Sequence, residues 1–388
     1  MKIPCSLHRL LIDLYYLFFR VLSFLFFFLR VKNKIVFNNF NGRGFGENPQ
    51  YIAQEIIRQG LKYDLVWLVS DMNSTMPCEI RKVKIDTIRA AYELATARVI
   101  INNVKNYLPY KKKKEQYYIQ TWHGELPFKL IEGECADRLE KKYLKESKED
   151  SKKIDLLLSG CALDTSIYKN SFWYNGEILE KGLPKYDMLF ETSKERIEGI
   201  RKFLNIKDHH KVALYAPTFR DDGCFEAYYL DINALLKCLV DKTGSKWVII
   251  IRMHPNASSF SNSYNYSDTI INGSLVSDPQ ELVLISDLLV TDYSSFMIDF
   301  MISSKPIVIY ANDLETYEKQ RGLRPFYYQL PFVKAKNNKD LVDNIKNLDI
   351  DFYKSKEAEF VKECVRSFDN GHASECVVER IKKIMSKE

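Results

Sequence analysis

The sequence predicts an α/β protein of two domains, each with a parallel β-sheet covered by helices. Three observations support this prediction: the length of 388 residues, the alternation of short apolar runs with helical segments, and a polar interruption in mid-chain. A chain of this length exceeds one typical domain and suffices for two domains with separate cores. Short strands that alternate with helices are typical of βαβ units, in which successive strands run parallel.

The predicted strands are short runs rich in β-branched and aromatic residues. They lie at 34–40, 63–70, 97–104, 117–124 and 154–160, and then at 211–219, 246–255, 287–295 and 306–313. Residues 248–251 are continuously apolar, as expected for a strand covered by helices on both faces. A polar helical segment between Asp187 and Lys211 interrupts the alternation. We therefore predict domains at 32–190 and 191–350, and helices at 351–388 that pack back on the first domain.

The composition indicates a folded protein. Apolar residues make up 46% of the chain and charged residues 28%, which excludes a disordered or fibrous protein. The eight cysteines are scattered, without a Cys-x-x-Cys pair or a histidine at zinc-ligand spacing. We interpret them as reduced thiols of a cytosolic protein; the alternative is a disulfide framework. The net charge of +6 favours an anionic partner, and phosphorylated substrates or anionic lipids fit better than nucleic acid.

The N-terminal segment is apolar but carries a polar stripe at helical spacing. The polar residues of this stripe are Arg9, Asp13, Tyr16 and Arg20. They argue against a bilayer-spanning helix, since a charge near the bilayer centre costs a few kcal/mol. We predict that residues 1–31 form an amphipathic helix in the membrane surface, whose following basic residues meet anionic headgroups. A removable signal peptide is not expected, because no small-residue cleavage site follows. The alternatives are a buried core helix and a partner-binding helix.

Four polar clusters follow predicted strands, at the edge where open α/β sheets bind their ligands. They occupy 120–124, 215–220, 252–255 and 291–295. His123 is a candidate general base, because imidazole accepts a proton near neutral pH; a structural hydrogen-bonding role is the alternative. Thr218 and Arg220 follow the strand-ending Pro217 and are candidates for binding a phosphate. The alternative there is a turn with a surface arginine.

The other two clusters also favour an anionic ligand. Arg252 and His254 lie two residues apart on an extended chain, so both can neutralise a diphosphate. Ser294 or Ser295 can cap the following helix while its free N–H groups bind a phosphate, and Asp299 lies one turn further on. Together the clusters predict a nucleotide diphosphate between two Rossmann-like domains.

Several cofactor classes are not indicated. The glycine-rich stretch 41–49 lacks the G-x-G-x-x-G spacing, and no Walker A lysine is present, which argues against NAD and ATP chemistry. No carboxylate cluster requires a metal; Asp292 and Asp299 are the residues that would hold Mg²⁺ if one is used.

At these clusters the chain resembles the CDP-glycerol glycerophosphotransferase family, the teichoic acid primases and polymerases of Gram-positive bacteria. The motifs that carry the resemblance are QTWHG at 120–124, GLPKYD at 182–187, YAPTFRDD at 215–222, RMHP at 252–255, TDYSSFMIDF at 291–300 and DNGHAS at 369–374. They follow the family's order and span roughly Ile35 to Ile384. The resemblance implies a GT-B fold, in which two Rossmann-like domains face a cleft.

The resemblance also implies a reaction: an acceptor hydroxyl attacks the β-phosphate of CDP-glycerol or a similar CDP-alditol such as CDP-ribitol, and CMP is released. His123 would be the base, and His254 would stabilise charge on the diphosphate. The donor-binding residues would be Trp122, Gly124, Lys185, Pro217, Thr218, Arg220, Arg252, Met253, Asp292, Ser294, Ser295 and Asp299. The chain departs from the family at Lys185, where arginine is usual, and in the loop that follows Gly124.

We therefore predict a peripheral enzyme on the cytoplasmic face of the cell membrane. It would transfer glycerol phosphate, or another alditol phosphate, to a lipid-linked teichoic acid or capsule polymer. The alternatives are a GT-B glycosyltransferase that uses a nucleotide sugar and a catalytically silent scaffold subunit. The sequence does not distinguish a glycerol from a ribitol donor, or a primase from a polymerase.

Overall fold

The computed structural model describes residues 24–105, 111–124, 128–220 and 226–386, together with positions 14, 17, 18, 21 and 223. Most of the predicted membrane-surface helix at 1–31 lies outside these residues, including every residue of its polar stripe. Within the described part of the chain, no helix is long and apolar enough to cross a membrane.

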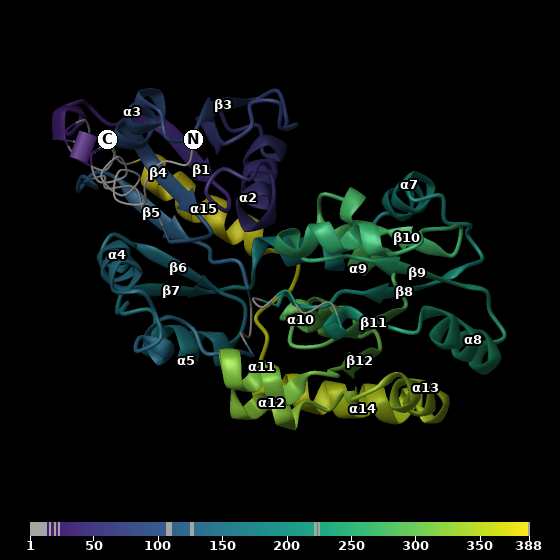
Figure 1. Ribbon diagram of the computed structural model, residues 1–388. Coiled ribbons are helices and arrows are strands. Elements are labelled where there is room, and N and C mark those ends of the chain that lie inside the picture. Colours follow the sequence, from purple (N-terminus) through teal and green to yellow (C-terminus); the bar gives the residue numbers. More distant parts are fainter. Residues whose placement is uncertain are drawn as a thin grey trace, which may run out of the picture.

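The first sheet contains seven strands in the order β3-β2-β1-β4-β5-β6-β7, and all its neighbouring strands run parallel (Figure 1). The strands are β1 (Lys32–Asn38), β2 (Asp64–Val69), β3 (Ile80–Lys84), β4 (Ala97–Asn102), β5 (Tyr117–Gln120), β6 (Leu156–Ser159) and β7 (Glu177–Glu180). The helices along this part of the chain are α2 (Glu47–Arg58), α3 (Ile88–Thr96), α4 (Lys141–Ser151) and α5 (Ala162–Ser171).

The side chains of β1 alternate between two apolar layers. Ile35 and Phe37 pack in one buried cluster with Ile52 of α2, whereas Val36 packs in another with Leu94 of α3. Successive side chains of a strand point to opposite faces of a sheet, so both faces must be apolar when helices cover both. This explains why the central strands appear in the sequence as continuous apolar runs.

The second sheet contains six strands in the order β10-β9-β8-β11-β12-β13, again all parallel. The strands are β8 (Lys211–Tyr215), β9 (Trp247–Ile251), β10 (Ile270–Asn272), β11 (Leu288–Thr291), β12 (Ile307–Tyr310) and β13 (Val333–Ala335). The helices are α6 (Asp187–Phe190), α7 (Lys194–Phe203), α8 (Ile232–Thr243), α9 (Pro279–Ile285), α10 (Phe296–Ile302), α11 (Leu314–Arg321), α12 (Pro325–Gln329), α13 (Asn338–Asn347) and α14 (Ile350–Phe360).

In both sheets the strand order reverses at one point, between β1 and β4 in the first and between β8 and β11 in the second. Ligands of open α/β sheets bind outside the carboxyl ends of the strands at such a reversal. All the predicted strands form. The strands that the prediction missed, β3, β7, β10 and β13, are the outermost strands of the two sheets within the described residues.

The last helix, α15 (Ala373–Met385), returns to the first sheet and lies beside α2, far from α14 (Figure 1). Its buried residues Val377, Val378 and Ile381 join the cluster that contains Ile35 and Phe37. Asp187 accepts hydrogen bonds from the N–H groups of Ala373 (2.9 Å) and Ser374 (2.7 Å), which joins the GLPKYD and DNGHAS motifs. The domain boundaries at residues 190 and 350 stay a prediction.

Candidate active site

The loop after β5 in the first sheet meets the start of α10 beside the second sheet. A Cβ atom added to Gly124 would lie 3.6 Å from the Ser295 Oγ. On its other side the loop is held by Asn48 of α2, whose Nδ2 donates a hydrogen bond to the Trp122 carbonyl at 3.2 Å. The carboxyl ends of both sheets thus contribute to one site, and two of the predicted clusters meet there.

His123 is held by a backbone carbonyl and by aromatic rings. Its Nδ1 lies 2.8 Å from the Asn103 carbonyl oxygen, and its ring packs against Phe40 (5.0 Å between centroids) and Trp122 (4.3 Å). A carbonyl only accepts hydrogen bonds, so Nδ1 carries the proton and Nε2 keeps a free lone pair. Burial lowers the pKa of His123 to about 4, and the nearby Lys185 and Lys129 add to this shift. The imidazole is therefore neutral at physiological pH.

His254 follows β9, and its ring stacks on that of Phe219, 5.8 Å away between centroids. Desolvation lowers the pKa of His254 to about 4, and the positive charges of Lys129, Arg43 and Arg252 lower it further. Lys129 acts on both histidines, which indicates that the two imidazoles share one cationic environment. Such a cationic site is suited to a ligand with several negative charges.

Arg252 is fixed by the backbone of the neighbouring loop. Its Nη1 donates to the carbonyls of Gly273 (2.9 Å) and Val276 (2.7 Å). A guanidinium has five N–H donors in a planar fork, so these bonds orient the group while leaving other donors for a ligand.

Arg220 and Asp292 pair with each other, and their predicted contacts with the donor stay a prediction. The Arg220 side chain is 2% exposed and forms ion pairs with Asp292 (2.8 Å) and Asp313 (2.6 Å). Asp292 also accepts bonds from the backbone N–H and the Oγ1 of Thr218, at 2.9 Å and 2.6 Å. The guanidinium and the two carboxylates thus neutralise one another at the ends of β8, β11 and β12. The geometry favours a role for Arg220 and Asp292 in shaping the loop that carries Thr218.

Ser294 and Ser295 stand at the beginning of α10. The Ser294 Oγ accepts a bond from the Phe296 N–H at 3.2 Å, as the predicted capping role requires. Ser295 makes no side-chain capping bond, and its hydroxyl faces Gly124 across the site. Ser295 is therefore the better placed of the two to contact a ligand.

Lys185 and Asp299 lie deeper between the two sheets. The Lys185 Nζ lies 3.7 Å from the Glu47 Oε2, and burial raises the pKa of Glu47. Asp299 is buried and accepts bonds from the Tyr186 hydroxyl and the Gln280 side chain, both at 2.8 Å. These bonds hold Asp299 in the junction of the two sheets, and its predicted contact with the donor stays a prediction. Glu47, which the sequence analysis did not single out, lies inside the glycine-rich stretch 41–49.

The remaining predicted residues form the walls of the site or lie behind it. Trp122 adopts a positive φ of 54°, which turns the backbone just before His123, and its ring packs edge-on against Phe172. Pro217 and Met253 are buried next to Thr218 and Arg252. Among the residues that the structure describes, no group of three or more His, Cys, Asp or Glu side chains is arranged to hold a metal ion.

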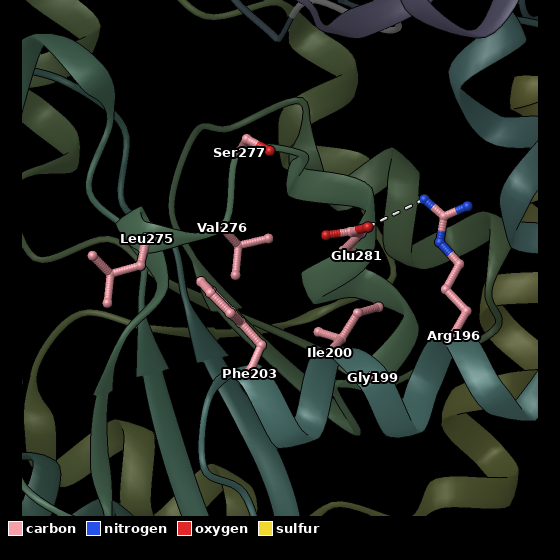
Figure 2. A pocket seen from close by; sticks show the side chains of 8 residues that line it. All are labelled: Arg196, Gly199, Ile200, Phe203, Leu275, Val276, Ser277 and Glu281. Carbon is pink, nitrogen blue, oxygen red and sulfur yellow. Dashed lines mark hydrogen bonds and ion pairs between the residues drawn. The ribbon is translucent and has the colours of Figure 1, made fainter. Parts of the chain in front are cut away.

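A separate hollow of about 410 Å³ lies between α7 and residues 275–281 (Figure 2). Phe203 and Val276 line it, and the ion pair of Arg196 with Glu281 (3.2 Å) closes one side. None of the sequence-predicted site residues lines this hollow.

The known proteins that this chain resembles point to one family. Residues 18–383 match the family described as CDP-Glycerol:Poly(glycerophosphate) glycerophosphotransferase. A teichoic acid poly(glycerol phosphate) polymerase of Staphylococcus epidermidis is 32% identical over 92% of this chain, which spans 52% of that protein's own length. A teichoic acid glycerol-phosphate transferase of Staphylococcus aureus is 30% identical, with 91% of this chain and 93% of that protein covered.

Solved structures agree with these matches. Structures of the wall teichoic acid polymerase TagF, one of them determined after a soak with CDPG, align with a TM-score of 0.83 at 29% identity. They cover 95% of this chain and 94% of theirs. The expected α/β fold with parallel sheets and the resemblance inferred from the motifs are both confirmed. The chain belongs to the CDP-glycerol:poly(glycerophosphate) glycerophosphotransferase family.

Proposed function

We propose that the chain transfers glycerol phosphate from CDP-glycerol to a hydroxyl of a lipid-linked cell-surface polymer and releases CMP. The observation that carries this proposal is the position of His123, a neutral imidazole held through its Nδ1 by the Asn103 carbonyl and next in the chain to Gly124, which lies near the Ser295 hydroxyl. Membership of the family and its likeness to a TagF structure soaked with CDPG support the donor. The chain spans about half the length of one matched polymerase, so the activity of that whole protein is carried over only as a proposal.

His123 acts as the general base. The Nε2 atom takes the proton of the acceptor hydroxyl while the oxygen forms a bond to the β-phosphorus of the donor. The bond from that phosphorus to the oxygen of the CMP group breaks, and its electron pair leaves with CMP. The Asn103 carbonyl holds the proton on Nδ1 and keeps the imidazole in the tautomer that this step requires.

The second sheet binds the donor diphosphate. Arg252 and the hydroxyls of Ser294 and Ser295 contact its oxygens, and His254 lies beside them. The negative charge of the bound diphosphate opposes the lowered pKa of His254, since a nearby anion favours the imidazolium. A protonated His254 then stabilises the charge that develops on the departing CMP.

The reaction is tested by CMP release from purified protein supplied with membrane extract and either CDP-glycerol or CDP-ribitol. We expect CMP from CDP-glycerol and much less from CDP-ribitol, because the relatives named above are glycerol phosphate enzymes. The His254→Gln variant should release CMP more slowly by roughly 100-fold, the typical effect of removing one such stabilising group. UDP release from UDP-sugars without CMP would instead show a glycosyltransferase, and no turnover of any donor by a protein that binds CDP-glycerol would show a silent subunit.

We also propose that the chain binds the inner leaflet of the cell membrane peripherally. Large apolar side chains in the described part of the N-terminal segment face solvent, among them Phe24 (60% exposed) and Phe28 (75%). The segment is fixed to the first sheet's unit, since Lys113 Nζ donates to the carbonyls of Phe26 and Leu29. Apolar side chains beside basic residues suit the interface of an anionic bilayer.

Replacing Phe28 with serine is expected to weaken binding to anionic vesicles at least about 10-fold. Transfer of a phenylalanine side chain from water contributes roughly 1.5–3 kcal/mol, and 1.4 kcal/mol corresponds to tenfold. The measurement is co-sedimentation with phosphatidylglycerol vesicles, with Phe203→Ser as the matched control, because Phe203 is also exposed (66%) but lies on α7. Equal losses in both variants would contradict an N-terminal membrane contact.

A further inference from the structure

Glu47 begins α2 in a backbone conformation that is unusual for a glutamate. Its φ is +57°, in the left-handed region that favours glycine. The next residue, Asn48, is held by two contacts: its Nδ2 donates to the Trp122 carbonyl (3.2 Å) and its Oδ1 accepts from the Lys185 N–H (3.1 Å). Trp122 directly precedes His123, so Glu47 adjoins the residue that fixes the loop of the general base. Strained backbone of this kind persists where the surrounding contacts determine it, and it clusters at ligand sites.

The same helix reaches the side of the site that we assign to the donor diphosphate. Tyr51 lies one turn after Glu47 on the same face of α2, and its hydroxyl donates a hydrogen bond to the Asp278 carboxylate. Asp278 lies two residues after Val276, whose carbonyl orients Arg252 at 2.7 Å. Short chains of contacts therefore join Glu47 both to the loop of the base and to the arginine of the second sheet.

The carboxyl group of Glu47 has an oxygen atom whose hydrogen-bonding capacity is unused. The Oε2 atom is buried and accepts no hydrogen bond from the part of the chain that the structure describes. It lies 3.7 Å from the Lys185 Nζ, which exceeds hydrogen-bond distance. The whole side chain keeps 17% exposure, so a small ligand group can approach the carboxyl group. A buried acceptor without a donor costs free energy, and a donor from a ligand would remove that cost.

A carboxylate at this place is suited to the uncharged part of the donor molecule. It repels the diphosphate, because like charges at short distance raise the energy of the complex. The alditol portion of the donor, in contrast, carries free hydroxyls, which donate hydrogen bonds and lie only a few bonds from the β-phosphorus. Hydrogen bonds from a hydroxyl to a carboxylate are stronger than those between neutral groups.

We propose that Glu47 accepts a hydrogen bond from a free hydroxyl of the alditol portion of the CDP donor. The inference rests on the proposed function and deepens it, since it assigns a residue to the recognition of the alditol itself. Glu47 is thus a specificity-determining residue: it favours a donor that carries hydroxyls over one that carries a plain alkyl group.

Calorimetric titration without acceptor tests this assignment with three ligands: CDP-glycerol, CMP, and CDP-propyl, in which a propyl group without hydroxyls replaces the glycerol. We expect the wild-type protein to bind CDP-glycerol at least about 10-fold more tightly than CDP-propyl, as for one hydrogen bond to a charged group. In the Glu47→Ala variant this ratio of Kd values should fall to about 1. The ratio cancels the general effect of removing a negative charge, because that effect acts on both ligands alike.

Two further variants make the test specific. Glu47→Gln keeps the shape of the side chain and a neutral acceptor, so its ratio should lie between those of the wild type and the alanine variant, and it can be measured even if the alanine variant does not fold. Glu55→Ala is the matched control and should keep the wild-type ratio. Glu55 also lies on α2 and is 10% exposed, but it pairs with Arg58.

A wild-type ratio near 1, or an unchanged ratio in both Glu47 variants, would overturn the inference. So would an equal loss of affinity for CMP and CDP-glycerol in Glu47→Ala, since Glu47 would then contact the nucleoside. The reaction is scored separately by CMP release with membrane extract. The expected ratios in a protein that releases no CMP would count against the proposed function alone, and CMP release with a ratio near 1 would count against the inference alone.

Discussion

Replacing His123 with glutamine is expected to slow CMP release by about 100- to 10,000-fold, the usual contribution of a positioned general base. Glutamine retains a side-chain donor for the Asn103 carbonyl but has no basic nitrogen, so the loop can keep its shape while the proton acceptor is lost. The measurement is the initial rate of CMP release at saturating donor and acceptor. His209→Gln is the control, because His209 is exposed and lies on the loop after α7.

The pH dependence gives a second test of the same residue. With a pKa of about 4, His123 stays neutral between pH 5 and 8, whereas an ordinary histidine with a pKa of about 6.5 would lose half of its base form at pH 6.5. We therefore expect kcat/KM to stay level as pH falls from 7 to 5.5 and to decline only near pH 4. The lowered pKa also links His123 to folding stability. The contribution of the neutral imidazole to the free energy of unfolding is fully present above about pH 6.5, and it is lost as pH falls through about 4. A decline centred at pH 6.5 would contradict the environment described for His123.

The Arg220→Leu substitution is expected to lower the free energy of unfolding by about 3–5 kcal/mol, the cost of leaving a buried charge without its partner. Asp292, 3% exposed, would keep Thr218 as a hydrogen-bond donor but lose its cation, and Asp313 would lose its bond to the Arg220 Nε. The stacking of the guanidinium over Tyr293 and Tyr317, at 5.0 Å and 4.9 Å, would also be lost. Urea unfolding monitored by tryptophan fluorescence measures the change.

The control is Lys152→Leu, which removes an ion pair with Glu149 that is exposed on both sides (67% and 55%) and should cost less than about 1 kcal/mol. A direct donor contact by Arg220 would give a different pattern: a raised KM for CDP-glycerol with unchanged stability. That pattern would support the donor contact predicted for Arg220.

The central strands of both sheets could be predicted from the sequence, because burial on both faces requires continuous apolar runs such as residues 248–251. The outermost strands could not. β7, for example, has the sequence Glu-Ile-Leu-Glu with both glutamates exposed, and β10 is only Ile270–Asn272. An outer strand pairs on one side only and is commonly short or polar, so it lacks the apolar pattern on which the prediction depends.

The site shows the same division between local and distant information. The sequence indicated that Thr218, His254 and Ser295 follow strands, and adjacent carboxyl ends bring such residues together in any parallel sheet. The partners of Arg220 are Asp292 and Asp313, 72 and 93 positions along the chain. No local pattern predicts that those carboxylates neutralise the guanidinium, so a structural arginine could not be distinguished from a ligand-binding one.

The return of α15 to the first sheet determines the order in which the protein can complete its folding on the ribosome. Ile35, Phe37 and Trp67 are synthesised before the second sheet, whereas Val377, Val378 and Ile381, which pack in the same cluster, are synthesised after it. Until then this apolar face is covered only in part, by α2 and by residues such as Leu183 and Tyr186, and an uncovered apolar face favours aggregation. The core of the first sheet is therefore complete only after α15 has been synthesised and has returned to it.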